Sequence, residues 1–125
     1  MGLHANSNFL TAVKNALNGI QHALKAERNL KVHSLVTVAV VVLGFGFGIT
    51  SLEWLVILLA IGLVWSTELI NTAVENTVDL IVGEQLHPTA KVAKDVAAGA
   101  VIISTIVAML IGGIIFLPRI LTWFF

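Results

Sequence analysis

Four side chains that carry oxygen atoms recur at helical spacing in the middle of the chain. They are Glu68, Asn71, Glu75 and Asp79, and we call them the acidic stripe. On a single helix, at about 100° per residue, they fall within an arc of roughly 80°. Carboxylates stacked on one face repel one another, and near hydrocarbon they lose hydration at a cost of several kcal/mol. The stripe therefore predicts a bound cation, and oxygen ligands without cysteine favour a hard ion such as Mg²⁺.

The position of the stripe indicates what chemistry the cation would serve. Glu68 directly follows residues 54–67, which contain no ionisable side chain, so it lies closest to hydrocarbon. A carboxylate there suits a general base acting on a lipid alcohol, whereas Glu75, further along, is the better metal ligand. A charged helix end that leaves the membrane would explain any single carboxylate. Four acceptors opposite an apolar face favour a site instead.

The composition places this stripe in a membrane protein. Of the 125 residues, 58% are hydrophobic and 11% are charged, whereas a soluble domain carries about 25% charged residues. The formal net charge is zero and there is no cysteine. A basic nucleic-acid-binding surface, a disulfide framework and thiol chemistry are therefore not expected. We expect one small all-α membrane domain that covers residues 1–125.

Hydrophobic periodicity predicts four helices. Apolar residues recur about every 3.6 positions over 9–25, which is typical of an amphipathic helix lying on the membrane surface. Three longer apolar stretches, at about 34–50, 52–82 and 90–117, are each long enough to span a bilayer. The fold class we expect is thus an all-α protein with three transmembrane helices and an N-terminal amphipathic surface helix.

The ends of these segments carry their own signals. Ser51 and Thr89 are expected to cap the second and third spans, and Pro118 is expected to end the third. At about 1.5 Å per residue, Glu68 lies about 21 Å along the second span from Trp54. The acidic stripe should therefore begin at the headgroups and extend into water, where a lipid head and a soluble reagent can meet.

Basic residues are distributed unevenly between the two sides of the expected bundle. Only Arg119 falls on the far side, and the remainder fall on the side of the N-terminus and the second loop: Lys14, Lys25, Arg28, Lys31, Lys91 and Lys94. The positive-inside rule then places the N-terminus and the acidic stripe in the cytoplasm. This is the side on which ATP is available.

Further ionisable residues gather on the same side as the stripe. Glu27, Glu84, Lys94 and Asp95 join it, and carboxylates with a lysine suit metal-assisted phosphoryl transfer. Glu27 could equally belong to a juxtamembrane anchor with Arg28. No Walker A loop or kinase glycine-rich loop is present. The histidines are scattered without metal-ligand spacing, so we assign them no metal role.

The run from Glu68 to Asp79, ELINTAVENTVD, resembles the signature of the small bacterial integral-membrane lipid kinases, the diacylglycerol kinase and undecaprenol kinase family. Segments 26–29 and 93–95 are also similar to the family, and the resemblance covers about residues 9–115. It implies a homotrimer of three-span subunits, each with a surface helix, in the bacterial plasma membrane. It also implies ATP as the phosphoryl donor, with divalent ions bound beside it.

The resemblance implies roles for individual residues. Glu68 matches the proposed catalytic base, and Glu27 and Glu75 match the metal ligands. The positions around the nucleotide are matched by Asn71, Asp79, Glu84, Lys94 and Asp95.

The substrate remains open among lipid alcohols. The segment His87–Lys91 is more similar to the undecaprenol kinases, so undecaprenol is favoured, with diacylglycerol as the alternative. A small proton-coupled transporter is a remote alternative, but it predicts carboxylates near the bilayer midplane rather than at the interface. A purely structural scaffold would leave the acidic stripe unexplained.

Overall fold

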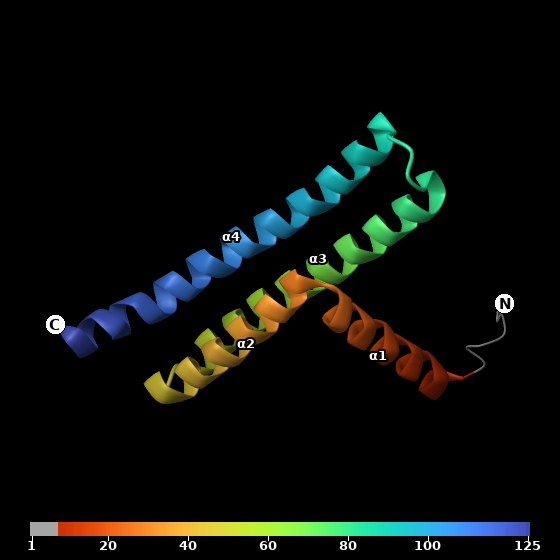
Figure 1. Ribbon diagram of the computed structural model, residues 1–125. Helices are drawn as coiled ribbons and strands as arrows, with labels where there is room; N and C mark the ends of the chain where they lie inside the picture. Colours follow the sequence, from red (N-terminus) through yellow and green to blue (C-terminus); the bar gives the residue numbers. More distant parts are fainter. Residues whose placement is uncertain (1–7) are drawn as a thin grey trace.

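The computed structural model describes residues 8–125, which fold into four helices joined by short turns. The helices are α1 (Phe9–Ala26), α2 (Arg28–Phe47), α3 (Ser51–Val82) and α4 (Pro88–Phe124). α3 and α4 run antiparallel side by side, and α2 packs along the first half of α3 (Figure 1). α1 turns away at its junction with α2, so that it extends sideways from the other three helices (Figure 1).

Three of these helices, α2, α3 and α4, are long and apolar enough to cross a membrane. The protein is therefore all-α with three candidate spans, as the sequence predicts. Many of their large apolar side chains are exposed in the single chain, Leu35 by 73% and Leu59 by 74%. A bilayer or a neighbouring helix can cover such surfaces, because lipid tails are as apolar as the side chains themselves.

The packed core lies near the turn between α2 and α3, where α4 also passes. Its buried members come from that turn, α3 and α4, and they are Ile49, Ile57, Ile115 and Phe116; Val40 and Phe47 of α2 are partly buried against them. Beside it, the Trp54 ring lies against Gly44, and a Cβ added to Gly44 would come within 2.6 Å of that ring. Glycine at this position thus allows α2 and α3 to approach closely.

The caps at two helix starts differ from the predicted ones. Thr50, in place of Ser51, caps α3, because its Oγ1 accepts a hydrogen bond from the Glu53 backbone at 3.2 Å while the Glu53 side chain accepts one from the Thr50 backbone at 3.0 Å. This reciprocal pairing satisfies two backbone donors at once. His87, in place of Thr89, caps α4, because its ring Nδ1 accepts a hydrogen bond from the Thr89 backbone N–H at 3.2 Å. Pro88 takes the first helical position, where no N–H partner is needed.

The prediction that Pro118 ends the last helix is wrong, since α4 continues through it to Phe124. Proline removes one helical hydrogen bond, but the next side chain adds others. The Arg119 guanidinium donates to the carbonyl of Ile115 at 2.7 Å and to both carboxylate oxygens of Glu53 on α3 at 2.8 Å. These contacts tie the end of α4 to the start of α3 and hold the helix past the proline.

Candidate active site

Glu68 lies in the middle of α3 and is buried, with 2% of its surface exposed. Its Oε1 atom lies 3.1 Å from Nε2 of His33 on α2. A buried carboxylate is stable only with a hydrogen-bonding or charged partner. His33 is that partner, and the contact sets the orientation of the carboxylate toward α2.

Further polar contacts hold the three spans together around this carboxylate. Trp65 donates through Nε1 to the hydroxyl of Thr37 at 3.0 Å, and that hydroxyl donates to the carbonyl of His33 at 2.7 Å. On the α4 side, the hydroxyl oxygens of Ser104 and Thr67 lie 2.7 Å apart. A slip in helix register would leave such groups unpaired, so these contacts fix the register.

Asn71 and Glu75 continue the acidic stripe along α3. The amide Nδ2 of Asn71 donates to Oε1 of Glu75 at 3.2 Å, as neighbours four positions apart on a helix can. The amide oxygen of Asn71 is buried and has no partner within residues 8–125. An unpaired buried oxygen next to a half-buried carboxylate suits a cation or a ligand donor.

The stripe ends at the turn between α3 and α4, where charged side chains of both helices meet. Asp79 forms an ion pair with Lys94, with Oδ1 and Nζ 2.5 Å apart. Lys91 pairs with Asp95 at 2.6 Å, and Glu84 is exposed in the turn itself. A soluble, charged ligand can reach these groups, because four of the five are exposed and Lys94 is half-buried.

Glu27 stands apart from these contacts, half-buried in the extended backbone between α1 and α2. Within residues 8–125 no three Asp, Glu or His side chains lie close enough together to hold a metal ion. The predicted ligands Glu27 and Glu75 therefore supply separate carboxylates rather than a closed cage. Such a set fits Mg²⁺, which binds through one or two carboxylates and completes its shell with phosphate oxygens and water.

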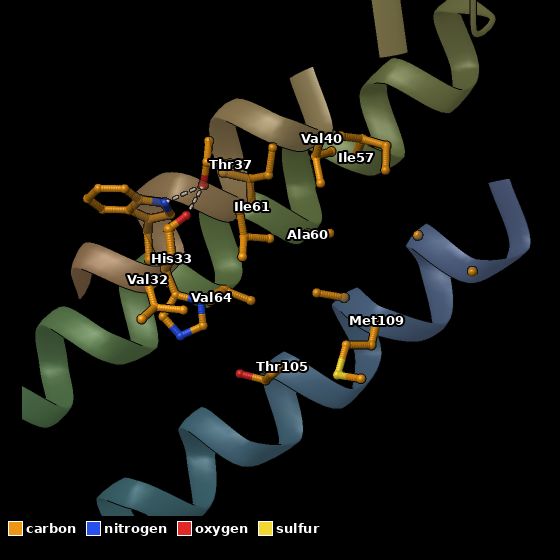
Figure 2. A pocket seen from close by; sticks show the side chains of 15 residues that line it. Val32, His33, Thr37, Val40, Ile57, Ala60, Ile61, Val64, Thr105 and Met109 are labelled. Carbon is orange, nitrogen blue, oxygen red and sulfur yellow. Dashed lines mark hydrogen bonds between the residues drawn. The ribbon is translucent and has the colours of Figure 1, made fainter. Parts of the chain in front are cut away.

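An apolar cavity of about 480 Å³ lies between α2, α3 and α4. Figure 2 shows Thr105 and Met109 of α4 facing wall residues of the other two helices, with His33 and Val64 near one end of the row. Other wall residues are Val32, Val36, Val40, Ile57, Ala60 and Ile61. Because His33 both lines the cavity and contacts Glu68, the cavity leads toward the buried carboxylate.

The spacing of the histidines excludes a metal site but does not predict the contact between His33 and Glu68. The two residues lie 35 positions apart on different helices, so no local spacing links them. One signal was available. His33 directly precedes residues 34–47, which carry no ionisable side chain, and ionisable residues of membrane-spanning helices are often functional.

The comparisons with known proteins bear on what this arrangement does. A family model described as prokaryotic diacylglycerol kinase matches residues 14–116, which is most of the chain. The chain belongs to the prokaryotic diacylglycerol kinase family. The matched range includes the acidic stripe, Glu27 and the α3–α4 turn.

Relatives within the prokaryotic diacylglycerol kinase family carry two names. The chain is 42% identical to an undecaprenol kinase of Bacillus subtilis over 113 residues, 90% of this chain and 91% of that protein. It is 38% identical to a diacylglycerol kinase of Synechocystis sp. over 115 residues, 92% of this chain and 66% of that protein. It is 32% identical to a diacylglycerol kinase of Haemophilus influenzae over 111 residues, 88% of this chain and 93% of that protein. This family member is therefore a lipid kinase.

Proposed function

We propose that the protein transfers the γ-phosphate of ATP to the hydroxyl group of undecaprenol. The observation that carries the proposal is a buried carboxylate, Glu68, contacting a residue that lines an apolar cavity. The cavity suits a hydrocarbon chain, and the carboxylate suits the alcohol at its end. Undecaprenol is favoured because the relative named undecaprenol kinase is more similar to this chain than the two named diacylglycerol kinases.

In the proposed reaction, the oxygen of the lipid alcohol forms a bond to the γ-phosphorus. The bond from that phosphorus to the bridging oxygen breaks, and ADP leaves. Glu68 accepts the hydroxyl proton as the general base. Its burial restricts the access of water, which favours transfer to the lipid alcohol over hydrolysis of ATP.

We assign the charged groups at the α3–α4 turn to the nucleotide. The Lys94 ammonium would face phosphate oxygens, and its ion pair with Asp79 holds the lysine beside the stripe. The unpaired amide oxygen of Asn71 offers a further acceptor. Two exposed carboxylates complete the groups that we assign to the nucleotide, and they are Glu84 in the turn and Asp95 on α4.

We assign Glu27 and Glu75 to Mg²⁺ that accompanies ATP. Glu75 is oriented by the Asn71 amide, and Glu27 lies at the α1–α2 junction. When bound, the ion would offset negative charge on the β- and γ-phosphate oxygens. The same ion would also stabilise the acidic stripe, because its positive charge would reduce the repulsion between the carboxylates of the stripe.

In the membrane, we place α1 flat on the cytoplasmic surface of the bacterial plasma membrane. Its apolar side chains are exposed in the single chain, Phe9 by 79% and Leu17 by 60%, and a lipid interface would cover them. The excess of lysine and arginine on this side of the bundle supports a cytoplasmic N-terminus and active site by the positive-inside rule. We also propose a homotrimer, which would cover part of the exposed apolar surface of the spans.

Phosphate transfer by the purified protein tests this proposal. The protein is incubated in micelles with radiolabelled ATP and Mg²⁺, with either undecaprenol or dioleoylglycerol as acceptor. We expect labelled undecaprenyl phosphate and a higher kcat/KM for undecaprenol. A higher kcat/KM for dioleoylglycerol would reassign the substrate, and no transfer to either lipid would refute the proposed reaction.

A further inference from the structure

His33 is a polar residue that the proposed reaction has not yet used. Its side chain is 19% exposed, and it lies between the apolar cavity and the buried carboxylate of Glu68. A histidine in this place has a purely structural explanation, which is that it joins α2 to α3. The surrounding contacts allow a more specific role to be argued.

The backbone and ring of His33 are held by contacts on successive turns of both helices. One turn before it on α2, Leu30 is completely buried. One turn after it, the Thr37 hydroxyl binds the His33 carbonyl and also accepts from Trp65 of α3. Trp65 and Glu68 are one turn apart on α3, so the contact at the His33 carbonyl and the contact at its ring lie next to each other. The backbone of His33 is thus held beside α3, and the contact with Glu68 orients the ring.

We propose that His33 is a positioning residue for the reaction, one that holds Glu68 in the orientation needed to accept the proton of the lipid alcohol. This inference rests on the proposed role of Glu68 as the base. The contact engages Oε1, and we assign Oε2 to the substrate hydroxyl. A base held to one rotamer keeps its proton-accepting oxygen in place, and a misplacement of 1 Å can cost about 100-fold in rate.

The same contact links lipid binding to the base. His33 lines the cavity that we assign to the hydrocarbon chain, so a lipid alcohol in that cavity would reach the imidazole next to Glu68. His33 would thus bring the end of the lipid and the accepting oxygen into register. The nucleotide groups lie further along α3 and on α4, so the role predicts an effect on turnover rather than on ATP binding.

Two substitutions at position 33 test the inference with undecaprenol and radiolabelled MgATP. His33→Leu removes the donor, and we expect kcat to fall by roughly 100-fold with KM for ATP unchanged. His33→Gln retains a side-chain donor that can reach Glu68, and we expect it to restore kcat to within about tenfold of the original protein. Equal losses in the two variants, or a kcat within twofold of the original in His33→Leu, would overturn the positioning role.

A matched control separates positioning from general packing. Ser104→Ala removes another buried contact between helices, the one with Thr67 next to Glu68, without altering the cavity wall or the base. We expect the kcat of Ser104→Ala to stay within about twofold of the original protein. A loss of kcat equal to that of His33→Leu would mean that His33 only supports packing.

The variant Glu68→Gln separates the two proposals. If Glu68→Gln keeps full activity, the base assignment itself fails. If Glu68→Gln is inactive and His33→Leu is fully active, only the role of His33 fails.

Discussion

Glu68 and Glu75 are two carboxylates on one face of α3, yet their surroundings differ. Glu68 is buried and contacts an imidazole, whereas Glu75 is half-buried and accepts from the amide of Asn71. Different surroundings allow identical side chains to take different roles in one site. This contrast is why we assign proton transfer to the first carboxylate and metal binding to the second.

The substitution Glu68→Gln separates these two roles. The amide keeps the size of the side chain but cannot accept the alcohol proton as a base, so we expect kcat to fall by about 10²- to 10⁴-fold. Binding of MgATP, measured by equilibrium dialysis, should be unchanged. In the parallel variant Glu75→Gln, the binding of MgATP should weaken instead. Loss of nucleotide binding in Glu68→Gln would contradict the assignment.

The ion pair between Asp79 and Lys94 gives a second prediction for single residues. We expect Lys94→Gln to raise KM for ATP by about tenfold, because a charged donor to phosphate is lost. The melting temperature should hardly change, since the pair is exposed and such pairs contribute little to stability. Lys91→Gln is the matched control, because Lys91 pairs with Asp95 on the same helix and has no assigned phosphate contact. Steady-state kinetics showing equal KM values for both variants would refute the role of Lys94.

At the scale of the helices, the packing of α2 against α3 depends on a glycine. In Gly44→Ala the new Cβ would lie 2.6 and 2.7 Å from two Trp54 ring atoms, so the Trp54 ring or one of the two helices must shift. We expect a loss of about 1–3 kcal/mol in stability, as for other overpacked sites. Gly46→Ala is the control, because a Cβ there meets no atom within 4 Å. Thermal unfolding in micelles compares the two, and an equal melting temperature would show that α2 and α3 are not held this closely.

The helices themselves could be predicted from hydrophobic period and length, but several of their ends could not. The spans follow from long runs without ionisable residues, which only lipid or a packed bundle can accommodate. The continuation of α4 past Pro118 could not be predicted, because the supporting contact between Arg119 and Glu53 joins positions 66 apart. The cap of α3 is Thr50 rather than the predicted Ser51. Both residue types can cap a helix, and only the pairing with Glu53 distinguishes them.

The acidic stripe could likewise be read from spacing, whereas its partners on other helices could not. Asn71 and Glu75 meet because they are four positions apart on α3. The contacts of Glu68 with His33 and of Asp79 with Lys94 depend on how α2 and α4 are aligned with α3. That alignment is set by interlocking side chains such as Trp65 and Thr37, for which a single sequence has no local signal.

At the scale of the whole molecule, polar groups are segregated along the bundle. The acidic stripe runs from the middle of α3 toward the α3–α4 turn, where Asp79 pairs with Lys94, and the pair of Glu53 and Arg119 lies at the opposite end. The three spans are long and apolar enough to cross a membrane, so one orientation would present the candidate site to ATP and the other would hide it. The proposed kinase activity in the cell therefore depends on which way the protein is inserted.

Single-cysteine labelling tests this orientation, and the absence of cysteine from the natural sequence makes it direct. Gln85→Cys places a thiol in the exposed α3–α4 turn, and Phe125→Cys places one at the fully exposed end of α4. With a membrane-impermeant maleimide, we expect Gln85→Cys to react in inverted vesicles and Phe125→Cys to react in right-side-out vesicles. Detergent should expose both thiols and serves as the control. The reverse pattern would place the α3–α4 turn outside the cell, away from ATP, and would contradict the proposed cytoplasmic active site.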